Sequence, residues 1–398
     1  MRALKSLRLH ISIFGKTNVG KSSLLNALTR QDVSIVSDTK GTTTDVVEKS
    51  AELFPIGPVT FLDTAGIDDE TSLSEKRIEK TLKVLNRTDI ATLVITPDGL
   101  TDYDTDMISK FKELNIPFLV VINKSDIGNI TDEKLNAIKE YSKNIIVTSA
   151  LTQDNIVDEF VSELVKIVPD DFVNPPSILG DKLEPSDIVI LVTPIDKEAP
   201  KGRLILPQVQ TIRDILDNHC ISVVVQQDNL EKAINTLKIK PKLVVTDSQA
   251  FKEVDKIVPE DIDLTSFSIL FARLKGDLNT FIEGAKALDR LQPQDKVLIL
   301  ESCTHHAIDD DIARVKIPKL IEKTLGFKPV FEYKTGHDFP DITPYKLIIH
   351  CGACMTNRKE VLSRIMIANR KHVPITNYGI IISYCLKICD RATKIFHA

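Results

Sequence analysis

Short apolar runs alternate with amphipathic stretches along the first 168 residues of the chain. Each run has the length of a buried strand in a parallel sheet, and the stretches between the runs have helical periodicity, as at residues 74–87 and 132–141. The predicted strands are residues 7–14, 59–63, 90–96, 118–124 and 145–149. This regular alternation predicts a doubly wound α/β domain over residues 1–168.

Prolines interrupt the pattern after residue 168. Pro169, Pro175 and Pro176 restrict their own backbone and that of the residue before them, which predicts a linker over residues 169–185.

A second, smaller βα series follows, and we assign it to residues 186–262. Its predicted strands are residues 187–193, 203–206, 222–226 and 243–246, and its predicted helices are residues 208–218 and 230–237. A sheet of about three or four strands buries little surface alone, so we expect it to pack on a partner along an edge or a face. We therefore predict a dimerisation domain, with packing inside the chain as the alternative.

A third βα set occupies residues 263–398. Its predicted strands are residues 296–301 and 345–350, and its predicted helices are residues 309–325, 359–370 and 379–396. The predicted fold class is thus α/β with three domains.

Charge and composition exclude some classes of partner. The 398 residues carry a formal net charge of −5, from interspersed acidic and basic residues, so the basic stripe that binds a phosphate backbone is missing and nucleic acid is not expected as the principal partner. No apolar run approaches the roughly 18 residues needed to cross a bilayer. We expect no membrane association and a cytoplasmic location, where thiols stay reduced and the six cysteines serve as free thiols or metal ligands.

Residues 15–22, Gly-Lys-Thr-Asn-Val-Gly-Lys-Ser, match the phosphate-binding loop G-x-x-x-x-G-K-S, and Ser23 follows it. Gly15 and Gly20 allow backbone amides to close around phosphate oxygens. Lys21 adds a positive charge near the β- and γ-phosphates, and Ser22 can bind Mg²⁺.

Three further motifs follow in the order expected for a guanine-nucleotide site. They are Asp63-Thr64-Ala65-Gly66, Asn123-Lys124-Ser125-Asp126 and Thr148-Ser149-Ala150. Asp63 ends a predicted strand, where its carboxylate can reach Mg²⁺ through water. Asp126 can accept both the ring N–H and the exocyclic amine of guanine, a pair that adenine lacks, so the predicted ligands are GTP and GDP with Mg²⁺.

The first 168 residues resemble the GTPase branch that contains the tRNA-modification GTPase and Era. Residues 41–45 resemble its switch I, which implies that Thr43 contacts Mg²⁺ and the γ-phosphate. Asn18 matches an asparagine that helps to bind K⁺ in potassium-activated members, although a turn without a cation is the alternative. Ile67 stands where Ras-like proteins carry a water-orienting glutamine, and Glu75 matches the carboxylate of the tRNA-modification GTPase, with an ordinary solvated helix residue as the alternative.

A second set of candidate ligands lies near the carboxyl terminus. Cys303-Thr304-His305 and His350-Cys351-Gly352-Ala353-Cys354 each follow a predicted strand, and ligands of open parallel sheets collect beyond such strand ends. Three thiolates favour zinc or an iron–sulfur cluster. The residue types allow both a Cys₃His zinc site with His305 or His350 and a cubane held by Cys303, Cys351 and Cys354.

The spacing Cys-x-His, 44 residues, His-Cys-x-x-Cys resembles the cluster motif of the HydF family, the maturation GTPases of FeFe-hydrogenases, and residues 195–208 resemble that family's middle domain. The resemblance implies a homodimeric scaffold or carrier that binds a 4Fe–4S cluster through the three cysteines. It also implies that the chain accepts a transient di-iron precursor, made with two radical-SAM maturases, and delivers it to apo FeFe-hydrogenase. The fourth cluster ligand stays open among His305, His350, a carboxylate of the middle domain and an exchangeable group.

Two competing functions remain at this stage. One is a zinc-stabilised GTPase acting in tRNA modification or ribosome assembly, and the other is a regulatory switch with redox-sensing thiols. The other cysteines are expected to be structural: Cys385 and Cys389, four residues apart, would share one face of a helix, and Cys220 would lie at a helix end.

Overall fold

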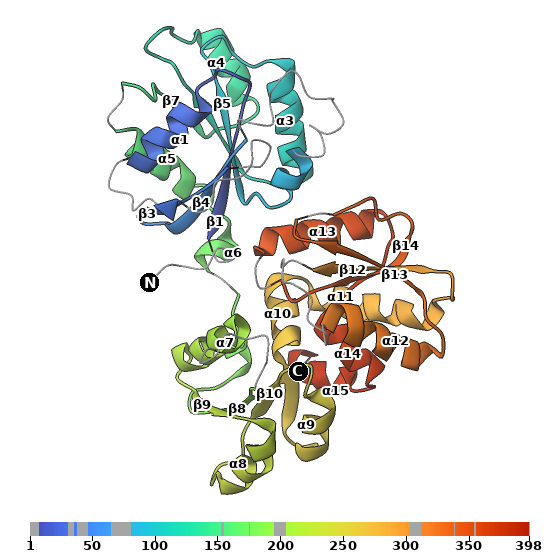
Figure 1. Cartoon of the computed structure of the whole chain (residues 1–398). Helices are drawn as coiled ribbons and strands as arrows, with labels where there is room; N and C mark the ends of the chain where they lie inside the picture. The colour runs from blue at the N-terminus through green and yellow to red at the C-terminus, as the bar shows by residue number, and fades with distance from the viewer. Residues whose placement is uncertain are drawn as a thin grey trace. The chain divides into compact units, whose positions relative to one another are not determined.

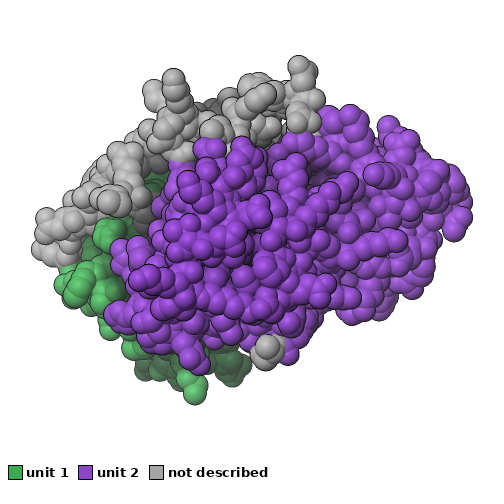
Figure 2. Space-filling model, turned by 90° about the horizontal axis from the view of Figure 1, so that it is seen from below, with its two compact units in different colours: residues 1–175 green, residues 176–398 purple. Residues whose placement is uncertain are grey.

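The computed structural model describes residues 8–30, 36–37, 47–64, 81–152, 155–174, 176–194, 204–301, 312–337, 339–353 and 356–397. The chain forms two compact units, Met1–Pro175 and Pro176–Ala398, which Figure 2 colours separately. Among the described residues, no helix is both long enough and apolar enough to cross a membrane.

Unit 1 contains a seven-stranded sheet in the order β2-β3-β4-β1-β5-β6-β7, with helices on both faces (Figure 1). The short pair β2–β3 and the pair β3–β4 are antiparallel, and the other neighbours are parallel. The strands are β1 (Leu9–Phe14), β2 (Val36–Ser37), β3 (Val47–Leu53), β4 (Gly57–Asp63), β5 (Ile90–Ile95), β6 (Phe118–Ile122) and β7 (Ile145–Val147). The helices are α1 (Lys21–Arg30), α3 (Asp102–Glu113), α4 (Asp132–Lys139), α5 (Ile156–Val165) and α6 (Asp170–Val173).

The predicted strands of unit 1 and the predicted helix at 132–141 are confirmed, with ends shifted by a few residues. Residues 74–80 of the other predicted helix lie outside the described residues. The central strand β1 is fully buried, because Leu9, Ile11 and Ile13 pack into one apolar core with Leu24 and Phe61.

Unit 2 contains two four-stranded parallel sheets, in the orders β11-β10-β8-β9 and β13-β12-β14-β15. In each sheet the first strand lies between the second and the third, which creates a topological switch point at the carboxyl ends of the first and third strands. The strands are β8 (Ile188–Val192), β9 (Ile221–Val225), β10 (Leu243–Thr246), β11 (Asp263–Ser266), β12 (Lys296–Glu301), β13 (Val330–Thr335), β14 (Tyr345–His350) and β15 (Ile375–Asn377).

Helices join the two sheets of unit 2 into one apolar core that runs from Val192 and Val244 to Ile299 and Ile348. Figure 1 shows α13 on one face of the β12–β14 sheet and α11, α12 and α14 on the other. The helices are α7 (Leu206–Asp217), α8 (Leu230–Thr236), α9 (Phe251–Ile257), α10 (Phe267–Lys275), α11 (Leu278–Ala285), α12 (Ile317–Leu325), α13 (Arg358–Arg370), α14 (Tyr378–Cys385) and α15 (Cys389–His397).

Two local predictions for unit 2 were wrong. The predicted strand at 203–206 is not formed by its described residues: Leu206 begins α7, whose start is fixed by Pro207 in the first turn and by the Gln208 side chain, which accepts the Ile205 N–H at 3.2 Å. The predicted helix at 379–396 is two helices, α14 and α15, because Lys387 adopts a left-handed backbone with φ of 61°.

That break means that Cys385 and Cys389 do not share a face of one helix. Cys389 and Cys220 are buried and Cys385 is half-buried, as expected of structural cysteines. Burial raises the pKa of the Cys385 thiol to about 11, which keeps it protonated at neutral pH.

The predicted domain boundary at 262/263 falls immediately before β11, which pairs with β10 in the first sheet of unit 2. Both sheets lie within one compact unit, so the boundaries of the three domains stay predictions.

Helix α11 packs closely on β15 at Gly284, and a substitution there tests this packing. A Cβ at this position would lie 1.9 Å from the Ile375 carbonyl oxygen, and backbone cannot yield as a side chain can. Alanine would raise helix propensity by about 0.5–1 kcal/mol, but overpacking costs about 1–3 kcal/mol. We expect Gly284→Ala to lower the unfolding temperature of unit 2 in scanning calorimetry. Asn279→Ala on the exposed face of α11 is the control, and equal thermograms for both variants would contradict this packing.

Candidate functional site

The loop between β1 and α1 has the backbone shape of a phosphate cradle. Gly15 and Gly20 have φ of 145° and 96°, which L side chains rarely adopt. A Cβ at Gly20 would lie 2.2 Å from the Asn123 side-chain nitrogen, and one at Gly15 would lie 2.2 Å from the Val94 carbonyl oxygen. Both glycines are therefore required by conformation and by space. Asn18, at the predicted K⁺ position, has a left-handed φ of 67°.

The charged and hydroxyl groups of this loop lie where a magnesium nucleotide would need them. The buried Lys21 ammonium donates to the carbonyl oxygens of Gly15 at 2.6 Å and Lys16 at 3.0 Å, so it is held inside the loop. The Ser22 hydroxyl lies 3.4 Å from the Asp63 carboxylate, because β1 and β4 are paired in parallel with Ile13 opposite Asp63. The structure thus brings together Ser22 and Asp63, two of the three residues predicted to act at Mg²⁺.

Asn123 joins three segments that are far apart in sequence. Its side-chain amide donates to the Val19 carbonyl at 2.9 Å, and its amide oxygen accepts the Ala150 N–H at 2.9 Å. The Ser125 N–H also donates to the Thr148 carbonyl, at 3.1 Å. These bonds hold the phosphate loop and the two predicted guanine-binding motifs together, with Asp126 exposed at their edge.

The structure places only some of the predicted cysteine-site residues. Cys303, His305 and Cys354 lie outside the described residues, as do Thr43, Gly66 and Glu75 of the nucleotide site. Among the described residues, no group of three His, Cys, Asp or Glu side chains could hold a metal ion.

Pairing of β12 with β14 places the carboxyl ends of these two strands at one edge of the sheet. The strands are parallel neighbours with Leu300 opposite His350, and the Cys351 N–H donates to the Leu300 carbonyl at 2.9 Å. Cys351 follows the end of β14 directly, and Cys303 comes two residues after the end of β12 at Glu301. The described ends of β12 and β14 therefore lie side by side at the switch point of the sheet.

The backbone of Cys351 is held on both sides. Its carbonyl oxygen accepts from His350 Nδ1 at 2.8 Å and from the Asn377 side-chain amide at 3.2 Å. The chain then turns at Ala353, whose φ is 55°. The Lys275 ammonium donates to the Thr356 carbonyl at 3.2 Å, further along the same segment.

His350 is 1% exposed, and the described residues pair both of its ring nitrogens. Nε2 lies 2.8 Å from Arg364 Nη1. A guanidinium has only donors, so Nε2 accepts and Nδ1 carries the proton that is donated to Cys351. Burial, reinforced by the Arg364 charge, lowers the pKa of His350 to about 4, which keeps the imidazole neutral at physiological pH.

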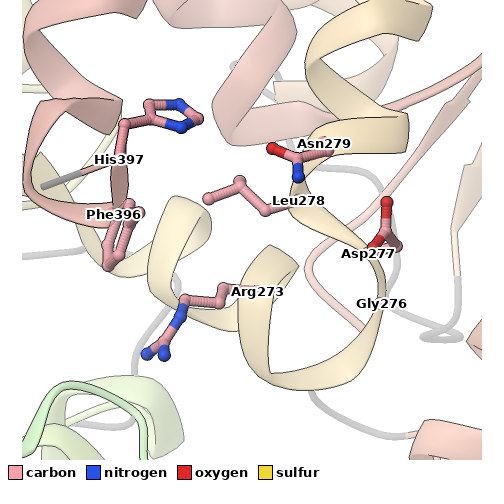
Figure 3. A pocket seen from close by; sticks show the side chains of 7 residues that line it. All are labelled: Arg273, Gly276, Asp277, Leu278, Asn279, Phe396 and His397. Atoms are coloured by element: carbon pink, nitrogen blue, oxygen red, sulfur yellow. The ribbon is translucent and has the colours of Figure 1, made fainter. Parts of the chain in front are cut away.

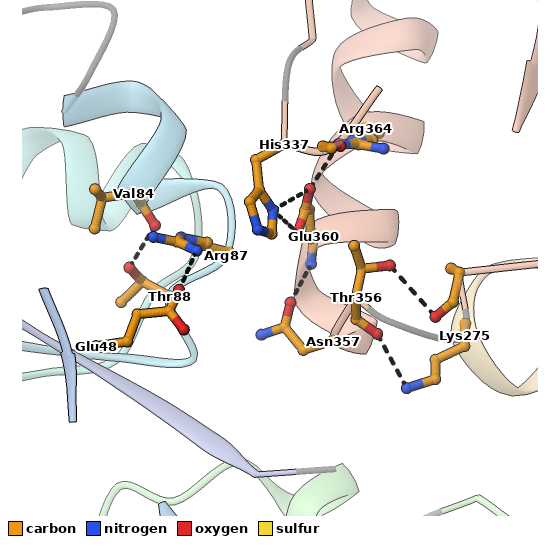
Figure 4. Close-up of polar contacts among 12 residues, drawn as sticks. Glu48, Val84, Arg87, Thr88, Lys275, His337, Thr356, Asn357, Glu360 and Arg364 are labelled. Atoms are coloured by element: carbon orange, nitrogen blue, oxygen red, sulfur yellow. Dashed lines mark hydrogen bonds and ion pairs between the residues drawn. The ribbon is translucent and has the colours of Figure 1, made fainter. Parts of the chain in front are cut away.

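Arg364, which bonds His350, also forms a buried ion pair with Glu360 on α13, and Figure 4 shows this pair beside His337. Arg364 Nη2 donates to Glu360 at 2.6 Å, and His337 Nδ1 lies 3.0 Å from the same carboxylate. The sequence reasoning missed Glu360 and Arg364. Their spacing of four residues on the face of α13 that also buries Val361 and Ile365 was the available signal, because buried charges require partners.

A separate shallow pocket lies at the junction of α10 and α11 beside the last helix (Figure 3). Its lining residues are Arg273, Gly276, Asp277, Leu278, Asn279, Phe396 and His397. None of them belongs to the predicted sites, and Arg273 is already bound to the Asp181 carboxylate.

The phosphate loop, the base-binding motifs and the sheet order define unit 1 as a P-loop GTPase domain, and residues 10–124 match the family model described as 50S ribosome-binding GTPase. In unit 2, residues 178–276 match the hydrogen maturase F dimerization domain and residues 279–395 match the hydrogen maturase F tetramerization domain. The chain belongs to the hydrogen maturase F family. It therefore carries domains of a type that self-associates, and the tetramerization domain had not been foreseen from the sequence.

Curated relatives match the GTPase part of the chain. The tRNA modification GTPase MnmE of Prochlorococcus marinus (strain NATL2A) is 39% identical over 163 residues, which are 40% of this chain and 34% of that protein. GTPase Der of a Nitratiruptor species is 34% identical over 175 residues, 41% of this chain and 37% of that protein. The chain thus spans about a third of the length of these relatives.

Among solved structures, a single-residue variant of Aquifex aeolicus Era bound to GDP·AlF4⁻ is similar, with 23% identity and a TM-score of 0.33 over 57% of this chain and 98% of that one.

Replacement of Asn123 tests whether its hydrogen bonds hold the nucleotide-binding loops together. Asn123→Ala would leave the Val19 carbonyl and the Ala150 N–H without these hydrogen-bond partners. An unsatisfied buried polar group costs about 1–3 kcal/mol of stability. We expect GDP affinity in titration calorimetry with Mg²⁺ to fall by at least about tenfold. Asn136→Ala, on the exposed side of α4, should leave it unchanged. Equal affinities for the two variants would contradict the role assigned to Asn123.

Proposed function

We propose that this chain is a GTP-hydrolysing scaffold of FeFe-hydrogenase maturation that holds a 4Fe–4S cluster through Cys303, Cys351 and Cys354. In this proposal it accepts a di-iron precursor as cargo from radical-SAM maturases and passes it to apo FeFe-hydrogenase. The observation that carries the proposal is the parallel pairing of β12 with β14, because it directs both cysteine segments to one edge of the sheet.

The nucleotide site supports Mg²⁺-dependent GTP hydrolysis. Lys21 lies inside the phosphate loop, and Ser22 lies beside Asp63 as a magnesium site requires. The proposal assigns Thr43 to Mg²⁺ and the γ-phosphate, Asn18 to K⁺ and Glu75 to the positioning of the attacking water. Hydrolysis then serves assembly or partner exchange.

The donor chemistry of the second site fits an iron–sulfur cluster. Three thiolates are soft ligands whose combined negative charge a cluster compensates, and a cubane bound by three cysteines keeps one iron for another ligand. The paired nitrogens of His350 leave that fourth position to His305, a carboxylate or an exchangeable group. When bound, the cluster would supply an iron site open to exchange.

Anaerobic reconstitution with iron and sulfide tests this site. We expect brown protein with roughly four iron and four sulfide per chain. Cys351→Ser should lose most of this iron, whereas Cys385→Ser, at a half-buried cysteine of α14, should keep it. Colourless protein with stoichiometric zinc, or equal iron contents in the two variants, would contradict cluster binding.

Self-association through the first sheet of unit 2 is the second part of the proposal. β9 forms one edge of that sheet, and Ile221 and Val224 on it are 48% and 43% exposed. The opposite edge strand, β11, is packed against α15. Exposed apolar residues on an edge strand favour pairing with another strand. We propose that β9 of a second copy occupies this edge, in agreement with the match of residues 178–276 to a dimerization domain.

Charge on β9 should weaken this association. The double variant Ile221→Lys and Val224→Lys adds a positive charge to each face of β9, and charged side chains on an edge strand oppose pairing with another strand. We therefore expect sedimentation analysis to show a smaller species than the unmodified chain. Ile239→Lys, a change at another exposed apolar residue of the same domain, should leave the association state unchanged. A double variant of undiminished size would exclude the β9 edge.

A further inference from the structure

Arg364 ties together three segments that surround the end of β14. Besides His350 and Glu360, it donates to the Gly336 carbonyl at 3.0 Å and lies 5.7 Å from the centre of the Phe339 ring. Its side chain is 2% exposed. The guanidinium thus links α13, the segment after β13 and the last residue of β14.

His350 connects Arg364 to Cys351 through two hydrogen bonds. Its imidazole lies between Arg364, which bonds Nε2, and the Cys351 carbonyl, which bonds Nδ1. A histidine whose Nε2 must accept has only one neutral tautomer, with the proton on Nδ1, so the bond to Cys351 is imposed by Arg364. Asn377 fixes the same carbonyl from the other side.

We propose that Arg364 is a positioning residue of the cysteine site: through His350 it fixes the backbone of Cys351 and keeps the imidazole out of the metal's coordination. This inference rests on the proposed cluster site and deepens it. His350 is then a bridge between a buried guanidinium and the backbone of a proposed ligand, so the backbone that carries the Cys351 thiol is held before metal binds.

Burial of Arg364 makes its separation from His350 costly. For His350 Nε2 to bind a metal, Arg364 would have to release it and leave a charged donor without that partner in the interior. Such a group costs more than an ordinary lost hydrogen bond, because the interior cannot replace the partner with water. The Arg364 ion pair with Glu360 holds the guanidinium in place against this rearrangement.

A matched pair of substitutions at one position tests the bridge. The amide of His350→Gln can accept from Arg364 and donate to Cys351, so it reproduces both bonds, whereas His350→Leu can make neither. In metal-free, full-length protein we measure the rate of iodoacetamide modification of Cys351 by mass spectrometry. The expected rate is near that of the unmodified chain for glutamine and about five- to thirty-fold higher for leucine.

Cys220 and Cys389 are buried and report general unfolding in the same spectra. If iodoacetamide also modifies these cysteines in His350→Leu, a second variant takes its place, the double change Arg364→Met and Glu360→Gln. This double change removes the guanidinium that donates to His350 and leaves no unpaired buried carboxylate. Equal Cys351 rates in the glutamine variant and in whichever disrupting variant stays folded would overturn the proposal.

A second test uses protein reconstituted with iron and sulfide. Pulsed paramagnetic resonance should show the same nitrogen couplings in the unmodified chain and in His350→Gln, because the imidazole is not a ligand. Loss of a strong imidazole coupling in His350→Gln would overturn the proposal. Failure of the unmodified chain to take up iron would instead refute the cluster function, while the metal-free alkylation rates would still decide the role of Arg364.

Discussion

The parallel pairing of β12 with β14 is the constraint on which the account of the cysteine site depends. Parallel strands send their carboxyl ends to the same edge of a sheet, and Leu300 lies opposite His350 in this pair. Cys303 and Cys351 are 48 residues apart in sequence, and the strands that precede them, β12 and β14, end side by side. A different strand order would place these segments at separate positions along the edge.

The same rule builds the nucleotide site in unit 1. There β1 lies between β4 and β5, so the phosphate loop after β1 meets Asp63 at the end of β4. Each unit thus has its candidate site beyond the carboxyl ends of neighbouring parallel strands, where backbone N–H groups and loop side chains converge. The interactions that hold the two sites differ. Hydrogen bonds of the neutral Asn123 side chain hold the nucleotide loops, whereas a buried ion pair on α13 supports His350, the residue before Cys351.

The sequence predicted the strands next to both sites well, because β12 and β14 contain short apolar runs bounded by polar residues and β1 alternates apolar with polar residues. The phosphate loop and base-binding motifs could be found because their chemistry needs particular residue types at fixed spacing. Two of the features that escaped prediction have clear physical reasons. β13 carries charged residues on an exposed edge, and the division between α14 and α15 depends on one left-handed residue, Lys387.

The residues that support His350 left only a weak signal in the sequence. Arg364 and Glu360 have ordinary helix spacing, and only the packing of α13 shows that they are buried beside β14. Proximity in sequence placed His350 among the candidate ligands, whereas tertiary hydrogen bonds determine which of its nitrogens are available. Residues that position a ligand leave a weaker pattern in a sequence than the ligands themselves, because their partners come from distant segments.

X-ray diffraction from crystals of the anaerobically reconstituted chain, recorded at the iron absorption edge, tests the central claim most directly. The account predicts one anomalous iron peak per chain beyond the carboxyl ends of β12 and β14, in contact with the sulfur atoms of Cys303, Cys351 and Cys354. Iron bound elsewhere on the chain, or Cys303 turned away from Cys351 with no iron between them, would contradict it.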